Sequence, residues 1–197
     1  MKYTTIIFDL DGTLLNTLAA LAAATNYALA EHKLPQRTTD EVRLFVGNGI
    51  RKLIERAVPA DTPAELQEEV FSSFNKYYKQ HCADSTRPYD GVPQLLQQLR
   101  AAGCRTAIVS NKADYGVQAL AKQYFDGQLD AACGERAGIA KKPAPDMLLA
   151  IMQQLKAEPA STIYIGDSDT DIATASNAGV DCIGACWGFR GRVFLEA

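Results

Sequence analysis

Residues 3–13 read YTTIIFDLDGT, a short apolar run that ends in two aspartates and a glycine. Its β-branched and aromatic residues are typical of a buried strand. Similar runs follow at residues 104–109, 129–133, 162–165 and 181–185. Helical patterns lie between these runs, at residues 94–102, 145–156 and 169–178. Strands that alternate with helices predict right-handed crossovers and a parallel sheet covered on both faces, which is an α/β domain.

A long stretch without strand signals, residues 16–87, interrupts this alternation directly after the first strand. Its helical patterns cover residues 18–32, a capping box at 38–41, residues 50–58, and residues 63–82 behind the cap candidate Thr62. A loop in a compact α/β unit has about 2 to 6 residues, so this stretch predicts an inserted helical domain. We expect an α/β core at 1–15 and 88–197 and a helical cap at 16–87.

Composition excludes several classes of protein. The chain has 197 residues, of which 47% are hydrophobic and 22% charged, and these values rule out a disordered chain or a coiled coil. The net charge is -3 and the basic residues are scattered, which argues against nucleic acid as a partner. The apolar run at 18–24 is too short to span a membrane, and the N-terminus lacks a secretory signal. We therefore expect a cytoplasmic protein with reduced cysteines.

Aspartates gather at the ends of two predicted strands. Asp9 and Asp11 follow the first strand, and Asp167, Asp169 and Asp171 follow the run at 162–165. Buried carboxylates repel one another and favour protonation unless a cation neutralises them. With oxygen ligands only and no histidine cluster, the pattern favours Mg²⁺ over Zn²⁺.

Phosphate-binding groups follow other strands. Ser110 and Asn111 end the run at 104–109, and Lys142 precedes the helical pattern at 145–156. A hydroxyl, exposed amides and a fixed cation suit phosphate oxygens. Together with a carboxylate nucleophile and a metal, they are the components of phosphoryl transfer.

Four segments in this order carry a family resemblance: DLDGT at 9–13, SN at 110–111, KP at 142–143 and GDSDTD at 166–171. They resemble the four motifs of the haloacid-dehalogenase-like superfamily. The helical insert, which contains VGNG at 46–49, is similar to the cap of the phosphoglycolate phosphatase branch. The resemblance implies a doubly wound, Rossmann-like sheet with strand order 3-2-1-4-5 and an inserted helical cap.

The resemblance also implies catalytic roles. Asp9 would attack phosphorus and form an aspartyl phosphate, and Asp11 would act as the general acid and base. Mg²⁺ would be held by Asp9, the backbone carbonyl of Asp11, and Asp167. Asp171 would support Lys142 or the surroundings of the metal.

Substrate binding is implied at two places. In the core, the phosphate-binding residues would be Thr13, Ser110, Asn111 and Lys142, with Lys142 also offsetting the charge of Asp9. In the cap, the turn at Gly47 and Asn48 and the nearby Arg51 would shape the substrate pocket. A plain turn between two helices is the alternative interpretation of the Gly47 segment.

These inferences predict a Mg²⁺-dependent phosphomonoester hydrolase that acts on a small phosphorylated metabolite, with 2-phosphoglycolate as the favoured substrate. One alternative is a phosphosugar mutase of the same fold. Another is a catalytically silent binding module, although the complete set of carboxylates argues against it. A dehalogenase is disfavoured because Asp11 would have no task in that reaction.

Overall fold

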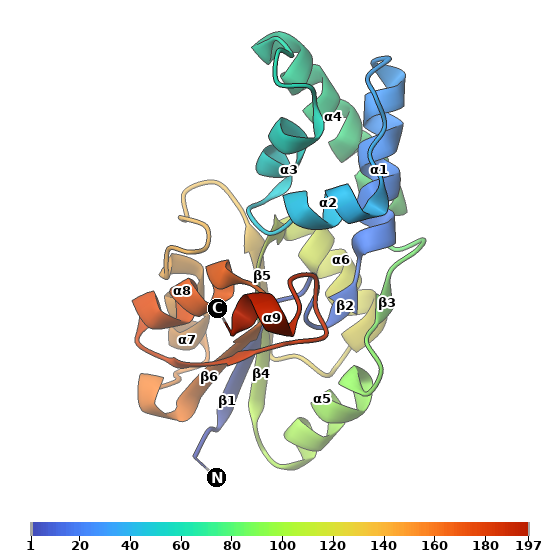
Figure 1. The fold of residues 1–197 in the computed structure, drawn as a ribbon. Coiled ribbons are helices and arrows are strands. Elements are labelled where there is room, and N and C mark those ends of the chain that lie inside the picture. The colour runs from blue at the N-terminus through green and yellow to red at the C-terminus, as the bar shows by residue number, and fades with distance from the viewer. Residues whose placement is uncertain (1, 197) are drawn as a thin grey trace. The chain divides into compact units, whose positions relative to one another are not determined.

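The protein is described by a computed structural model that covers residues 2–196 (Figure 1). The chain divides into two compact units. The first holds the chain up to Asn16 and from Pro88 onward, and the second is Thr17–Arg87.

The first unit is built on a five-stranded sheet in the order β5-β4-β1-β6-β7. Its strands are β1 (Thr5–Phe8), β4 (Arg105–Ala113), β5 (Ala131–Glu135), β6 (Thr162–Gly166) and β7 (Asp181–Gly184). Every neighbouring pair is parallel. Counted along the chain, these strands have the order 3-2-1-4-5, so the expected doubly wound α/β sheet is confirmed.

Helices cover the sheet on both faces (Figure 1). They are α5 (Val92–Ala101), α6 (Asp114–Phe125), α7 (Asp146–Gln154) and α8 (Asp169–Ala178). Two short helices complete this unit: η1 (Pro159–Ser161) precedes β6, and α9 (Arg192–Leu195) follows β7. Sequence reasoning did not predict α6. Gly116 lies in its first turn and its N-cap, Ala113, has no side-chain acceptor, so the helix lacks a clear start signal.

Alternate residues of the central strands form the core beneath α7 and α8. Ile7 of β1, Val109 of β4 and Tyr164 of β6 share this cluster with Leu148 and Ile151 of α7. Parallel strands place their carboxyl ends at one edge of the sheet. Packing on both faces therefore fixes the residues at that edge.

The second unit is helical, with α1 (Leu18–Glu31), α2 (Thr39–Phe45), α3 (Ile50–Ala57) and α4 (Ala64–His81). The predicted capping box is confirmed, because Thr38 and Glu41 exchange hydrogen bonds at the start of α2. Thr62 as the cap of the last helix is wrong. Pro63 occupies the N-cap position of α4 without a side-chain bond.

The segments that join the units pair as a two-stranded sheet of β2 (Leu15–Asn16) and β3 (Arg87–Pro88). The expectation that residues 16–87 hold no strand is therefore wrong at both ends of that stretch. Strands of two residues are too short to show an alternating pattern, and Pro88 lowers the strand propensity further.

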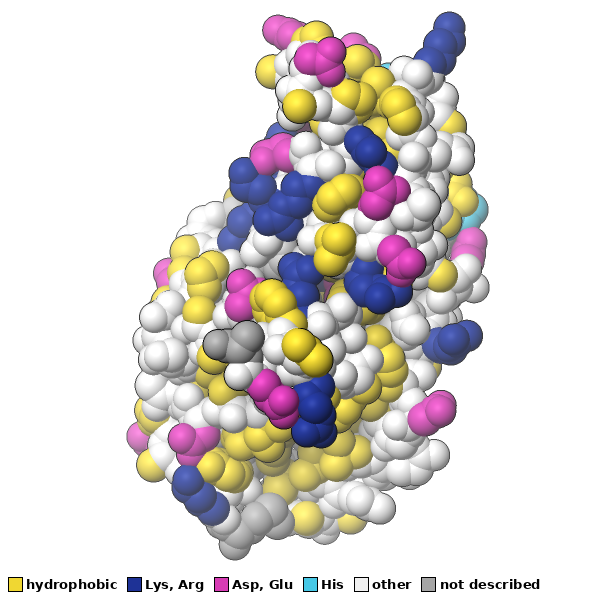
Figure 2. Space-filling model, viewed as in Figure 1, with side chains coloured by type: hydrophobic (Ala, Val, Ile, Leu, Met, Phe, Trp, Pro, Cys, Tyr) yellow, Lys and Arg dark blue, Asp and Glu magenta, His cyan; other side chains and the backbone are white. Residues whose placement is uncertain are grey.

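On the face shown in Figure 2, the described residues form no long stripe of a single charge. Basic and acidic side chains are interspersed there with scattered hydrophobic ones (Figure 2). Within residues 2–196, no helix combines the length and the apolar character needed to cross a bilayer. All five cysteines are free thiols.

Candidate active site

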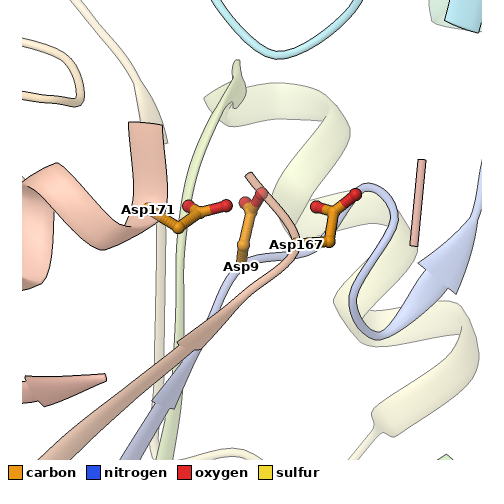
Figure 3. A group of neighbouring side chains, drawn as sticks. All are labelled: Asp9, Asp167 and Asp171. Carbon is orange, nitrogen blue, oxygen red and sulfur yellow. The ribbon is translucent and has the colours of Figure 1, made fainter. Parts of the chain in front are cut away.

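Three aspartates converge at the carboxyl edge of the sheet (Figure 3). Asp9 follows β1, Asp167 follows β6, and Asp171 lies in the first turn of α8. Each offers a carboxylate oxygen, and these oxygens lie within 4.8 Å of one another. The close approach follows from the parallel pairing of β1 with β6, which the Asp9 N–H extends by donating to the Ile165 carbonyl at 2.8 Å.

Lys142 places a buried ammonium group among these carboxylates. Its Nζ lies 2.6 Å from Asp171 Oδ1 and 3.0 Å from Asp9 Oδ1, and it donates to the Tyr164 hydroxyl at 3.0 Å. Burial alone would favour the neutral amine. The carboxylates of Asp171 and Asp9 outweigh that effect and hold the pKa of Lys142 well above its usual range. The group is therefore a permanent positive charge.

Asp171 is fully committed to hydrogen bonds within the protein. Its Oδ1 accepts from Lys142, while Oδ2 accepts from the backbone N–H of Ser168 at 3.0 Å and from its hydroxyl at 2.6 Å. This carboxylate therefore orients Lys142 rather than offering a free ligand atom. Gly166 makes the arrangement possible, because a Cβ there would lie 2.2 Å from Asp171 Cγ.

Asp167 is held by donors from two other segments. The backbone N–H of Phe189 donates to its Oδ2 at 2.7 Å, and the Thr13 hydroxyl lies 3.4 Å from its Oδ1. The Trp187 indole N–H donates to the Thr13 carbonyl at 3.0 Å and ties the two segments together. The approach is close because Gly188 has no side chain, since a Cβ there would lie 2.2 Å from Asp167 Cβ.

Two carboxyl groups in the cluster have pKa values above their ordinary range. Burial raises the pKa of Asp9 to about 6 and the pKa of Asp167 to about 8, and neighbouring carboxylates add to both shifts. Asp9 Oδ1 accepts no hydrogen bond from residues 2–196, although Lys142 Nζ lies close to it. Among the described residues, this carboxylate oxygen lacks a hydrogen bond and lies beside a second carboxylate. A site that offers only oxygen ligands in this way fits a hard divalent cation such as Mg²⁺.

The remaining core residues named by the motifs surround this cluster. Ser110 and Asn111 lie buried in β4, where the Ser110 hydroxyl bonds to Asp9 and the Asn111 amide donates to the Lys142 carbonyl at 3.0 Å. Asp11 forms an ion pair with Lys112, whose Nζ lies 3.0 Å from Asp11 Oδ1.

Two residues of the site escaped sequence reasoning as functional candidates: Tyr164 and Lys112. Tyr164 acts through a buried hydroxyl, which leaves no motif. Lys112 follows the Ser-Asn motif directly and could have been noticed from that position.

The predicted cap residues lie in the helical unit and contact other parts of it. The Arg51 guanidinium pairs with Glu68 at 2.5 Å and stacks over the Phe71 ring, 4.2 Å from its centroid. Asn48 Oδ1 accepts from Arg56 at 2.8 Å. Gly47, with a φ of 120°, begins the turn that leads into α3.

Comparison with known proteins assigns the family. A family model described as haloacid dehalogenase-like hydrolase matches residues 6–185. The chain belongs to this family. It is 32% identical to the phosphoglycolate phosphatase of Aquifex aeolicus over 93% of this chain and 85% of the relative. It is also 30% identical to the N-acetylmuramic acid 6-phosphate phosphatase of Pseudomonas aeruginosa, over 96% and 84% of the two chains.

A solved structure supports the same branch of the family. The crystal structure of a proposed phosphoglycolate phosphatase from Lactobacillus delbrueckii superposes on this chain with a TM-score of 0.94 and 35% identity. The match covers 100% of this chain and 91% of that one. The phosphoglycolate phosphatase-like branch implied by the sequence motifs is therefore confirmed.

The raised pKa of Asp167 predicts a pH-dependent stability for the metal-free protein. Because the folded state holds the proton up to about pH 8 and the unfolded state releases it near pH 4, the free energy of unfolding falls as pH rises between these values. Asp167→Asn removes that charge. We expect the variant's Tm in EDTA to exceed that of the wild type by at least about 2 °C at pH 8.5, and the gap to close near pH 4.

The matched control for this measurement is Asp169→Asn, which alters an exposed aspartate two residues away. Its Tm should follow that of the wild type at every pH. Equal Tm values for all three proteins at pH 8.5 would contradict the raised pKa of Asp167.

Proposed function

We propose that this family member is a Mg²⁺-dependent phosphomonoester hydrolase, acting in the cytoplasm on a small phosphorylated metabolite through an aspartyl-phosphate intermediate on Asp9. The observation that carries the proposal is the position of the Asp9 carboxylate. It is buried between the ammonium group of Lys142 and the carboxylate of Asp167. The named relatives support the class of reaction, because those at 30–35% identity are phosphatases.

In the first half-reaction, a carboxylate oxygen of Asp9 attacks phosphorus and displaces the alcohol of the ester. A new bond forms between Asp9 and phosphorus while the ester P–O bond breaks, and protonated Asp11 gives its proton to the departing oxygen. The phosphoryl oxygens would lie against Lys142 and Ser110, with amides of Thr13 and Asn111 close by. Lys142 suits this task because its charge is permanent.

In the second half-reaction, water attacks the phosphorus of the aspartyl phosphate. Asp11, now a carboxylate, takes a proton from that water, and the bond between Asp9 and phosphorus breaks to release inorganic phosphate. The same side chain therefore serves as acid and then as base. Both steps leave the enzyme in its starting state.

Asp9, Asp167 and the backbone carbonyl of Asp11 are the residues that would hold Mg²⁺. When bound, the ion neutralises these carboxylates and stabilises the charge on the phosphoryl oxygens. Asp171 would stay outside this ligand set, because its oxygens are used by Lys142 and Ser168.

The favoured substrate is 2-phosphoglycolate, which the names of several relatives support. The relative named for N-acetylmuramic acid 6-phosphate gives a specific reason to keep a phosphosugar as the second candidate. We propose that Thr17–Arg87 is a cap whose turn at Gly47 and Asn48, with Arg51, selects between such substrates. The β2–β3 pair would be its hinge.

Asp9→Asn tests the nucleophile. An amide is a poor nucleophile, so we expect kcat for phosphoglycolate to fall by at least about 10³-fold while Tm stays close to that of the wild type. The control is Asp169→Asn, which should keep its activity because that aspartate is exposed. Release of phosphate by Asp9→Asn at a tenth of the wild-type rate would exclude the assignment.

Metal removal tests the cation site. Excess EDTA should abolish phosphate release, and added Mg²⁺ should restore it, because Asp9 and Asp167 repel the incoming phosphate without a counter-charge. Mg²⁺ should also raise the Tm of the wild type but leave that of Asp167→Asn nearly unchanged. Undiminished turnover in EDTA would contradict the metal role.

A comparison of substrates tests the cap. Arg51→Ala should change kcat/KM unequally for phosphoglycolate and N-acetylmuramic acid 6-phosphate, while p-nitrophenyl phosphate is hydrolysed as before. Glu68→Gln is the matched control, because it breaks the same ion pair but keeps the guanidinium group. If both variants lower Tm alike and alter no substrate preference, Arg51 is only a structural residue of the helical unit.

A further inference from the structure

Building on the proposed function, we infer that Lys112 is a positioning residue that holds the carboxylate of Asp11 in the orientation for proton transfer. Its Nζ lies 3.0 Å from Asp11 Oδ1 and 3.3 Å from Oδ2, so both oxygens face one ammonium group. The side chain of Lys112 is 1% exposed and that of Asp11 is 14% exposed. Such a buried pair is weakly screened by water.

The fold makes specific room for this lysine. β4 continues beyond Ser110 to Ala113, and its register with β5 shifts between Val109 and Ala113. A Cβ at Gly134 of β5 would lie 2.6 Å from the Lys112 carbonyl oxygen, and a Cβ at Gly116 of α6 would lie 3.2 Å from Lys112 Cε. Glycine within a helix is less favourable than alanine, so the space at Gly116 has an energetic cost.

Electrostatics explains why the pair is kept. An ammonium group removed from water is strongly unfavourable unless an acceptor compensates it, and Asp11 supplies that acceptor, as a full negative charge once it has given up its proton. The contact fixes Asp11 in return, because moving its carboxylate away would leave a buried cation behind. Both ends of the pair are therefore restrained.

The proposed chemistry needs that restraint. Asp11 must meet the leaving-group oxygen in the first half-reaction and the attacking water in the second, with the same carboxylate. When Asp11 carries its proton on one oxygen, the other oxygen still accepts from Lys112, so one ammonium group can hold the carboxyl group before and after proton transfer. Positioning of this kind contributes to rate rather than to substrate affinity.

A rival explanation is that Lys112 binds the carboxylate of phosphoglycolate directly. The two roles differ in their substrate dependence. A positioning role affects every ester whose leaving group needs a proton, whether or not the substrate carries a carboxylate. A binding role affects KM for phosphoglycolate and spares a neutral alkyl phosphate.

The test compares Lys112→Met with Lys122→Met, which removes an exposed charge from α6, the helix that follows β4. For Lys112→Met we expect kcat to fall about 100-fold for phosphoglycolate and equally for propyl phosphate, with KM changed less than about threefold. p-Nitrophenolate needs no proton to depart. That substrate should therefore give a rapid burst of one equivalent, followed by turnover as slow as with the alkyl esters. Lys122→Met should match the wild type.

A double-mutant cycle shows whether Lys112 acts through Asp11. If it does, Asp11→Asn/Lys112→Met should have the same kcat as Asp11→Asn within about twofold. This double variant also removes both buried charges, so it can fold even if Lys112→Met alone does not, and a kcat more than about twofold below that of Asp11→Asn would then overturn the inference. The inference would be overturned if the losses in kcat of the two single variants multiply in the double variant. It would also be overturned if Lys112→Met affects only the KM for phosphoglycolate.

The wild-type measurement separates this inference from the proposed function. If the wild type releases phosphate from no ester while Mg²⁺ is present, the proposed function fails. If the wild type turns over and Lys112→Met equals Lys122→Met, the function stands and the role of Lys112 is wrong.

Discussion

The arrangement of the site depends on one constraint, the burial of several carboxylates beside a single ammonium group. Asp9, Asp167 and Asp171 lie close enough to raise one another's free energy, and Lys142 offsets only part of that cost. The aspartates of the cluster therefore have different roles. Asp171 fixes the lysine, while Asp9 Oδ1, which accepts no hydrogen bond from residues 2–196, is available for an incoming cation and for chemistry.

Crowding on this scale requires backbone without side chains. Gly12 and Gly188 lie against Asp167 from two segments, and Gly166 lies against Asp171, all at distances that a Cβ would not tolerate. Gly134 likewise leaves room for the backbone of Lys112 and Asp114 at the end of β4. These glycines bring main-chain amides to the carboxylates, as the Phe189 N–H shows, and amides provide hydrogen bonds without adding charge.

Much of the fold was predictable, because a parallel sheet is encoded by local patterns. The five strands of the sheet appear in the sequence as apolar runs, and α8 appears as a helix that ends at Gly179. The elements that were not predicted correctly are short or have weak sequence signals. α6 begins without a capping side chain and carries Gly116, β2 and β3 are too short to alternate, and Pro63 rather than Thr62 begins α4.

The sequence by itself determined where the strands lie along the chain, the resemblance to a family, and the chemical kinds of side chain at the strand ends, since each of these is carried by local patterns. Only the tertiary structure decided which of those groups meet. Lys112 pairs with Asp11 across 101 residues, and the Tyr164 hydroxyl reaches both Lys142 and the Val109 carbonyl. Such contacts depend on sheet register and glycine clearance, which arise from packing of the whole chain and leave no signal in any single segment.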